Sequence, residues 1–315
     1  MRTLSYFGAD PTKQDNSPSL QAALNHGGDI LIDEGSFACA QGVIATKPVR
    51  LIGESSRSAL LCNATIPDNS PLIHVSPDMT YGGDGYEFRD FQIAPGDSMA
   101  RASAIFFNTT GAGQFLRRTV VDGLIIGKMA DQCITSANGN ADGLVAPRIT
   151  NNTLCGGIFL QTAGDSLVIE NNLISGDGIG VFATFAAGAA CAQIVGNNIV
   201  NRGGALYLVG ALAPVIQGNN IESVVYGYNG GVDALVFLQD AISAAMVGNN
   251  VNSGSTADCI RLSGCKRTYF ESGHLQVSGT AKKHLRREWD QGSIVGGGIS
   301  YLDAALGAYV NGYFA

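Results

Sequence analysis

The stretch Ile-Val-Gly-Asn-Asn-Ile-Val, residues 194–200, places two asparagines inside an apolar run. The same Asn-Asn pair returns at 151–152, 171–172, 219–220 and 249–250. A buried amide that lacks hydrogen bonds costs roughly 1–3 kcal/mol, so a pair that recurs in apolar surroundings needs a structure that satisfies its amides. We therefore take the pair as the marker of an internal repeat.

The repeat has two registers. With the similar segments RDFQI (89–93) and VDGLI (121–125) added, the markers stand 20 to 32 residues apart, at positions 90, 122, 151, 171, 197, 219 and 249. A second series of short apolar segments runs in phase with them, centred on Ile134, Ile158, Ile179, Leu206, Leu235 and Ile260. Each repeat therefore holds at least two short strands.

These strands predict an all-β fold, a single-stranded parallel β-helix of about 9–10 coils that stack about 4.8 Å apart. The segment from marker to second strand varies from 7 to 16 residues and the return segment from 13 to 18, so one corner is expected to carry the loops. A propeller blade needs about 40–45 residues and fits poorly. In stacked coils each inward Asn can bond the Asn above and below it, so we interpret the pairs as structural.

Composition restricts the partners. The 315 residues carry a net charge of −7, which argues against a nucleic-acid partner, because phosphate binding needs an extended basic surface. The seven cysteines form no CxxC pair and are interpreted as buried residues of a reducing compartment. The start of the chain shows no signal segment and no stretch is long enough to span a bilayer, so we expect synthesis in the cytoplasm and no membrane insertion.

The N-terminus carries a second signature, YFGADPTKQDNSPSLQAALNHGGDILIDEGSF at 6–37. It predicts a short helix that Ser17 caps and that ends at Gly27-Gly28, followed by a strand. Together with VRLIGES (49–55) it resembles the pectate-lyase-like right-handed parallel β-helix superfamily, in the branch of phage tailspikes and polysaccharide depolymerases. The matching residues are Phe7, Gly8, Ala9, Asp15, Leu20, Ala22, Ala23, Gly27, Gly28 and Gly35.

The resemblance implies a right-handed coil, an extended polysaccharide partner, a homotrimer and a place in a virion tail, outside the cell when acting. Three segments are expected: an N-terminal cap of strand and short helix at 1–36, the β-helix at 37–279 and a C-terminal cap or oligomerisation segment at 280–315. Full tailspikes carry a head-binding region before this motif, so a truncated chain or an anchoring tail protein is expected.

The family's catalytic motifs are not matched. NADG (140–143) resembles the first motif of polygalacturonases, but GDGIG (176–180) has one carboxylate where two belong, and no histidine lies in a Gly-His-Gly. The acidic calcium ligands and Arg base of pectate lyases are not matched either. The sequence therefore predicts no cofactor and no metal site, and candidates for catalysis come from the predicted geometry.

Aspartates precede the second-series strands and form a predicted acidic column. Asp233 and Asp258 would lie roughly 5 Å apart on adjacent coils, and Asp177 and Asp233 about 10 Å apart. Glycosidases use two carboxyl groups about 5–5.5 Å apart for retention or about 6.5–9.5 Å apart for inversion. Asp240, after a strand, is a further catalytic candidate. The alternative for such aspartates is an Asx turn.

Two features predict substrate binding. If Ile158, Leu206 and Ile260 point inward, then Phe159, Tyr207 and Arg261 point outward on a mostly apolar face, either as a sugar-stacking platform or as a subunit interface. The 16-residue connection from Asn219 to Leu235 adds Glu222, Tyr226, Tyr228 and Asp233.

The predicted function is cleavage of glycosidic bonds in a bacterial surface polysaccharide or another extended glycan by a tailspike-type glycosidase. One alternative is a non-catalytic glycan-binding, receptor-binding or structural tail protein. Another is a polysaccharide lyase or uronate epimerase.

Overall fold

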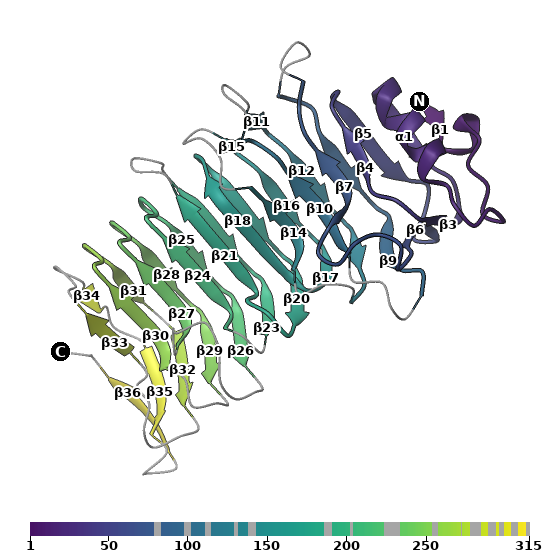
Figure 1. The fold of residues 1–315 in the computed structure, drawn as a ribbon. Coiled ribbons are helices and arrows are strands. Elements are labelled where there is room, and N and C mark those ends of the chain that lie inside the picture. Colours follow the sequence, from purple (N-terminus) through teal and green to yellow (C-terminus); the bar gives the residue numbers. More distant parts are fainter. Residues whose placement is uncertain are drawn as a thin grey trace.

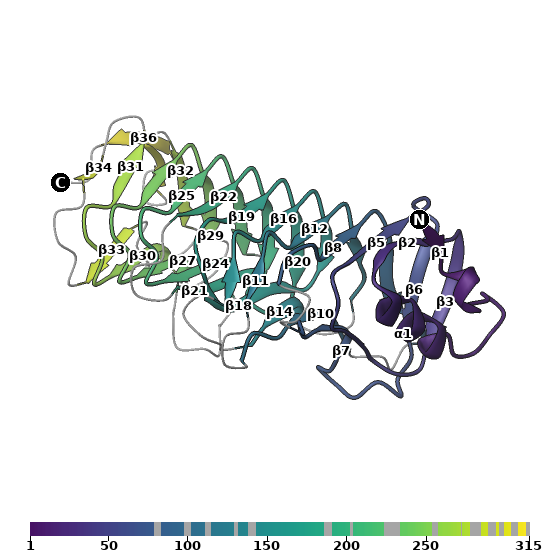
Figure 2. The same cartoon turned by 90° about the horizontal axis from the view of Figure 1, so that it is seen from above.

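The computed structural model of the protein describes residues 1–78, 83–97, 102–110, 115–128, 132–137, 143–185, 191–201, 204–223, 234–253, 258–271, 273–277, 285–288, 294–295, 299–303 and 308–312. The chain winds into a single-stranded, right-handed parallel β-helix whose coils advance from the N-terminal to the C-terminal end (Figures 1 and 2). The predicted fold class and the resemblance to parallel β-helix proteins are confirmed.

Three sheets, here called A, B and C in chain order, form the walls of the coil. Sheet A contains β1 (Arg2–Thr3), β2 (Gly28–Ile32), β5 (Val49–Gly53), β8 (Glu87–Arg89), β12 (Val120–Asp122), β16 (Arg148–Thr150), β19 (Leu167–Glu170), β22 (Ala192–Val195), β25 (Val215–Gln217), β28 (Ala245–Val247), β31 (Tyr269–Glu271) and β34 (Ile294–Val295).

Sheet B contains β3 (Gly35–Cys39), β6 (Ser58–Cys62), β9 (Gln92–Pro95), β13 (Ile125–Ile126), β17 (Thr153–Cys155), β20 (Leu173–Gly176), β23 (Asn198–Asn201), β26 (Asn220–Ser223), β29 (Asn250–Ser253), β32 (Gly273–Val277), β35 (Ile299–Asp303) and β36 (Ala308–Gly312). The last pair, β35 and β36, is antiparallel.

Sheet C contains β4 (Val43–Ala45), β7 (Pro71–Val75), β10 (Ser103–Phe107), β14 (Gln132–Ser136), β18 (Gly157–Ala163), β21 (Val181–Phe185), β24 (Leu206–Val209), β27 (Ala234–Gln239), β30 (Asp258–Ser263) and β33 (Leu285–Glu288). Two short strands, β11 (Leu116–Arg117) and β15 (Leu144–Val145), pair at its side. Each coil thus contributes one strand to each of three sheets, where the sequence pattern resolved two. The difference arises because only a two-residue corner separates sheets A and B.

The asparagine ladder stands at that corner. Asn172 shows the pattern, because its Nδ2 donates to Asn197 Oδ1 at 2.9 Å and to Ile149 O at 2.8 Å. Its Oδ1 accepts from the backbone N–H and the Nδ2 of Asn152, each at 2.9 Å. All four hydrogen-bonding sites of the amide are used, which is what allows it to be buried.

The ladder residues are Asn152, Asn172, Asn197, Asn219 and Asn249, all buried. Aligning every repeat on the first Asn of its pair was therefore wrong by one residue for the first two pairs. There, Asn151 (φ 58°) and Asn171 (φ 55°) adopt the left-handed backbone that Gly196, Gly218 and Gly248 adopt in later coils. The left-handed residue sets the position of the ladder Asn in each coil, because the ladder Asn comes directly after it.

Inward columns of aliphatic residues fill the coil. On sheet A, Ile149, Ile169, Ile194, Ile216 and Met246 stack in register. All five are buried, and comparable columns line the other sheets. Because neighbouring side chains in a column are one coil apart, they stay in van der Waals contact along the whole axis.

The second strand series is sheet C, with two register corrections. Ile158 pairs with Val181, not with Ile179, and Leu206 pairs with Val236, not with Leu235. The connections that enter sheet C differ in length between coils, so residue counting from the asparagine marker does not fix which residue points inward.

Helix α1 (Ser17–His26) follows a one-turn 3₁₀ helix (Ser5–Phe7) and lies at the N-terminal end of the solenoid (Figure 2). Its Leu20, Ala23 and Leu24 are buried, and Gly27 ends it with φ 72°. The predicted helix is confirmed, but Ser17 is its first residue and not the cap. The Ser17 hydroxyl instead donates to Gln41 O at 3.1 Å.

Of the basic segment KKHLRR (282–287), residues 285–287 are described, and they are extended. Strand β33 pairs in parallel with β30 as the last strand of sheet C. In the strand register, Leu285 and Arg287 continue the columns of Ile260 and Leu262.

Candidate functional site

A continuous column of outward side chains runs along sheet C. The strand register places one member on every coil: His74, Phe106, Thr135, Phe159, Phe182, Tyr207, Phe237, Arg261 and Arg286. We call this set the sheet C column. The predicted outward residues Phe159, Tyr207 and Arg261 all belong to it. Phe182 and Phe237 also belong to it, because Val181 and Val236 point inward in place of Ile179 and Leu235.

Neighbouring rings in the column are in contact. Phe159 and Phe182 stack with centroids 4.4 Å apart and planes 10° apart. His74 meets Phe106 edge to face at 5.0 Å, and Tyr207 meets Phe237 at 5.8 Å. The guanidinium of Arg261 lies 5.7 Å from the centroid of the Phe237 ring. The column is thus an ordered aromatic strip that ends in cations.

The strip is not equally accessible along its length. Tyr207 is 3% exposed and Phe237 8% exposed, and the Tyr207 hydroxyl donates to Ala234 O at 3.1 Å. His74, Phe106, Phe159 and Phe182 are half-buried. Tyr207 is therefore packed within the protein and offers no open ring face, and the accessible aromatic surface lies at Phe106, Phe159 and Phe182.

The predicted acidic column is described only in part. Asp258 pairs across the sheet with Ala234, and Asp233 lies outside the described residues. Asp258 is 1% exposed, and Arg286 Nε donates to its Oδ2 at 2.5 Å. A buried carboxylate needs such a partner, so the structure accounts for Asp258 as an ion-paired residue of sheet C.

The other two catalytic candidates lie apart from Asp258. Asp177 is exposed and accepts from Lys128 Nζ at 2.6 Å. It directly follows β20, three coils before β30, which corresponds to roughly 14 Å along the axis. Asp240 (φ 52°) lies at the opposite end of the sheet C strands, just after β27. The structure therefore brings none of these three carboxylates together.

The predicted loop residues are only partly described. Glu222 lies half-buried on the outward face of sheet B, in register with Val200 and Asn252. Tyr226 and Tyr228 lie outside the described residues.

His74 begins the aromatic strip and is electrostatically unusual. Its Nε2 is buried with no hydrogen-bond partner in the part of the chain that the structure describes, and burial lowers the pKa of the imidazole from 6.5. Its column neighbours are Ile44 and Phe106, both apolar. Nothing in the repeat pattern distinguished this histidine, because the pattern marks inward residues.

Two hollows of the described surface are polar. One, of about 300 Å³, lies on sheet A and is lined by Arg89, Val120, Asp122, Arg148, Thr150, Asn151, Glu170 and Asn171. The other, of about 530 Å³, lies at the first coils, where Glu34 and Arg57 form an ion pair at 2.9 Å. The sequence analysis did not predict the hollow on sheet A. A signal was present: the residue before the left-handed corner is polar in four successive coils, at Arg89, Asp122, Thr150 and Glu170.

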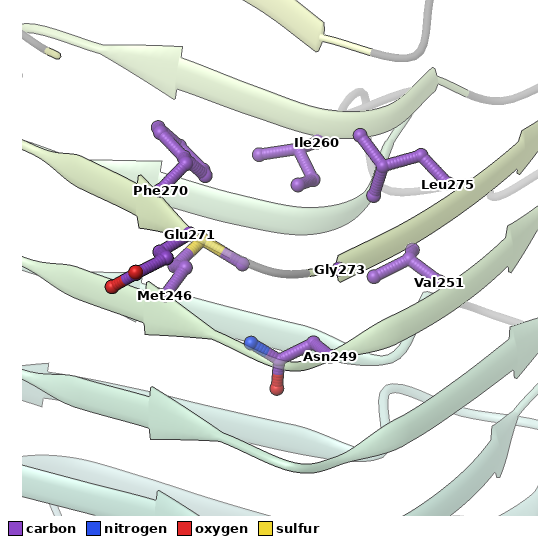
Figure 3. Close-up of a pocket in the computed structure, with 8 residues that line it drawn as sticks. All are labelled: Met246, Asn249, Val251, Ile260, Phe270, Glu271, Gly273 and Leu275. Atoms are coloured by element: carbon purple, nitrogen blue, oxygen red, sulfur yellow. The ribbon is translucent and has the colours of Figure 1, made fainter. Parts of the chain in front are cut away.

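A third hollow, of about 20 Å³, belongs to the core. The ladder stops after Asn249 because the next position is Gly273, which has no side chain. Figure 3 shows the space left between Asn249, Gly273 and the apolar side chains of Phe270, Ile260 and Leu275. This space is where the ladder ends, and it is too small for a substrate.

The fold and the outward strip define the class of protein. It is a single-stranded, right-handed parallel β-helix protein with an aromatic face. A scan against family models matches residues 66–274 to the family described as periplasmic copper-binding protein (NosD). The match covers more than half of the chain, so the protein belongs to this family. A comparison with curated proteins found no significant match.

Solved structures with the same fold come from several organisms. The A-module of the mannuronan C-5 epimerase AlgE4 of Azotobacter vinelandii is similar with a TM-score of 0.64 and 14% identity, over 98% of this chain and 84% of that one. Tailspike protein 3 of bacteriophage CBA120 is similar with a TM-score of 0.54 and 13% identity, over 96% and 57%. The surface protein and adhesin PfbA of Streptococcus pneumoniae is similar with a TM-score of 0.52 and 12% identity, over 92% and 96%. At these identities the likeness shows the fold.

In the described part of the chain, no helix reaches the length and apolarity that a membrane span requires.

Proposed function

We propose that this protein binds an extended glycan along the outer face of sheet C. The observation that carries the proposal is the sheet C column, with an aromatic ring on six coils, from His74 to Phe237. Aromatic faces pack against the apolar faces of pyranose rings, and a column with one side chain about every 4.8 Å suits a linear polymer.

The cationic end of the column gives the proposed partner a direction. Arg261 lies over Phe237, and Arg286 follows it on the next coil. Guanidinium groups bind carboxylates and hydroxyls through several donors at once. We therefore place the polymer with its neutral sugar faces over Phe106 to Phe182 and a polar or acidic group near Arg261.

The descriptions of two structural neighbours bear on the function: one names a glycan and the other names an enzymatic domain. One is an epimerase of mannuronan. Another is the enzymatically active domain of CBA120 tailspike protein 2, which is 12% identical with a TM-score of 0.55, over 96% of this chain and 46% of that one.

The finer proposal is that the protein cleaves the glycan as a glycoside hydrolase. Asp233, with Asp177 or Asp258, is the proposed acid and base pair, and Asp240 is the alternative on the other edge of sheet C. Incubation with capsular and O-antigen polysaccharides is expected to release new reducing ends, and Asp233→Asn is expected to abolish the release. Full activity of the Asp177→Asn, Asp233→Asn, Asp240→Asn and Asp258→Asn variants would contradict the assignment.

The products separate the remaining reactions. Unsaturated ends indicate a polysaccharide lyase, and an altered uronate without cleavage indicates an epimerase. Retained binding with no product indicates a glycan-binding or structural tail protein.

Binding is tested separately from cleavage. Phe159→Ala and Phe182→Ala are expected to weaken polysaccharide binding at least tenfold, measured by affinity electrophoresis, because each removes one ring of the stacked pair. Leu173→Ala is the matched control, since Leu173 is 42% exposed on sheet B just before the same coil enters β21. Equal binding by all three variants would contradict the proposal.

The remaining parts of the proposal concern assembly. We propose a homotrimer in a virion tail, with residues 1–36 and 280–315 as caps that hide the open ends of the sheets. Part of the sheet C face is then available as a subunit interface. Light scattering of the purified protein tests the trimer. A monomer that still binds glycan would mean that the sheet C column binds the ligand and is not a subunit interface.

The family description names copper, and the described residues do not fit a copper site. Copper ligands are histidine, cysteine and methionine side chains. His26, His74 and His274 lie on α1, sheet C and sheet B, and no three His, Cys, Asp or Glu side chains gather among the described residues. The proposed function therefore contains no copper step.

A further inference from the structure

A polar cavity of about 300 Å³ lies on the outer face of sheet A. Its lining comes from four successive coils, on β8, β12, β16 and β19, which follow one another along the wall in Figure 2. Sheet A and sheet C are different walls of the coil, so the cavity is separate from the sheet C column.

One half of the lining is fixed by internal hydrogen bonds. Asp122 accepts from Arg89 Nη1 at 3.1 Å, from Thr150 Oγ1 at 2.7 Å and from Asn151 Nδ2 at 2.8 Å. Arg89 also donates to Glu87 at 3.0 Å. These contacts hold Asp122 and Arg89 in place, so this side of the cavity is preorganised.

The other half carries polar side chains that the described residues leave unpaired. Arg148 has Val120 and Val168 as its cross-strand neighbours, and neither can accept its hydrogen bonds. Glu170 follows Asp122 two coils later in the same outward row. Asn171 stands beside Glu170 at the corner. Arg148, Glu170 and Asn171 therefore present donors and acceptors to whatever occupies the cavity.

The balance of charge selects the ligand class. Two guanidinium groups and two carboxylates line the cavity, so an anion such as phosphate is repelled by the carboxylates and a metal cation by the arginines. A sugar hydroxyl both donates and accepts, and it satisfies both kinds of group without bringing a charge. We infer that this cavity binds a neutral saccharide unit, with Arg148 and Asn171 donating to its hydroxyl oxygens and Glu170 accepting from its hydroxyls.

Titrations followed by saturation-transfer NMR test the site. Glucose, galactose, mannose, N-acetylglucosamine and their short neutral oligosaccharides are the probes, beside glucuronate, inorganic phosphate and calcium. The wild type is expected to bind at least one neutral sugar, and Arg148→Ala and Glu170→Ala are each expected to weaken that binding about tenfold or more. Oligosaccharides that bind more tightly than their monosaccharide identify a glycan chain as the source, and equal binding identifies a free sugar.

The first control lies on the same wall of the coil. Gln217→Ala lies two coils beyond Glu170 in the same outward row and is expected to bind as the wild type does. Leu173→Ala, on sheet B, is a second control and is also expected to leave this binding unchanged. Because Arg148 and Glu170 lie on sheet A, their variants keep the sheet C column intact, so failure here is distinct from failure of the sheet C proposal. Unchanged binding in Arg148→Ala and Glu170→Ala would overturn the inference, as would preference for phosphate or calcium or the absence of neutral-sugar binding.

Discussion

At the scale of single residues, the buried polar groups are of two kinds. An inner ladder asparagine such as Asn172 has every hydrogen bond of its amide made, whereas His74 Nε2 is buried with no partner among the described residues. The first kind maintains the fold, because its hydrogen bonds offset the cost of burial. The second kind costs free energy on burial, and this cost grows when the group must carry a charge.

The stability of the fold should therefore depend on pH through His74. Burial lowers its pKa, so as the pH falls below about 6.5 the unfolded chain takes up a proton before the folded chain does. Stability is therefore full above this pH and is lost as the pH falls toward the folded pKa. We expect the wild type to lose more stability than His74→Phe between pH 7 and pH 5, as measured by urea unfolding. Equal losses would show that His74 does not carry the effect.

The cysteines lead to a second expectation at this scale. Five of the seven are buried, and burial raises the pKa of Cys39, Cys62 and Cys259 to about 12. Only a thiolate reacts readily. Iodoacetamide at pH 8 should therefore label exposed Cys191 first and Cys155 more slowly. Mass spectrometry that finds Cys39 or Cys259 labelled in the native protein would contradict this burial.

At the scale of elements, the corner between sheets A and B is the most demanding part of each coil. Asn197→Ala removes the acceptor for the backbone and side-chain N–H groups of Asn172, and it also leaves Ile169 O without its side-chain donor. With about 1–3 kcal/mol for each unsatisfied buried group, we expect a loss of roughly 3 kcal/mol or more in the free energy of unfolding.

The neighbouring Asn198 supplies a matched control. It is exposed, and among the described residues its amide oxygen accepts only from Asn220 Nδ2 on the surface. Asn198→Ala is expected to change the free energy of unfolding by about 0.5 kcal/mol or less. Similar losses in the two variants would mean that the ladder does not stabilise the corner.

The sequence predicts most of the elements but not the register in which their residues stack from coil to coil. Repeated Asn-Asn pairs imply stacked coils, and helix α1 (Ser17–His26) follows from its proline and glycine boundaries. Which Asn of a pair faces inward depends on the left-handed residue before it, and this place is filled by Asn in two coils and by Gly in three. The sequence predicted the candidate site less well than the fold, because the connections into sheet C vary in length. As a result Val181 and Val236 lie in the inward column, and Phe182 and Phe237 lie in the outward one.

At the scale of the whole molecule, the solenoid offers three long walls with different chemistry. Sheet C carries the aromatic strip, sheet A the charge-balanced cavity, and sheet B an exposed run of asparagines in which Asn220 and Asn250 each donate to the Asn before it. Because the walls repeat every coil, a linear polymer can meet the same side-chain type several times along one wall. This geometry is the reason for proposing a glycan rather than a compact ligand.

The most direct test is a crystal structure of the protein with the shortest oligosaccharide that binds in the polysaccharide panel. We predict pyranose rings packed on Phe159 and Phe182, with the chain running across the coils of sheet C toward Arg261. Sugar density confined to sheet A or sheet B, with the faces of Phe159 and Phe182 bare, would contradict the central claim.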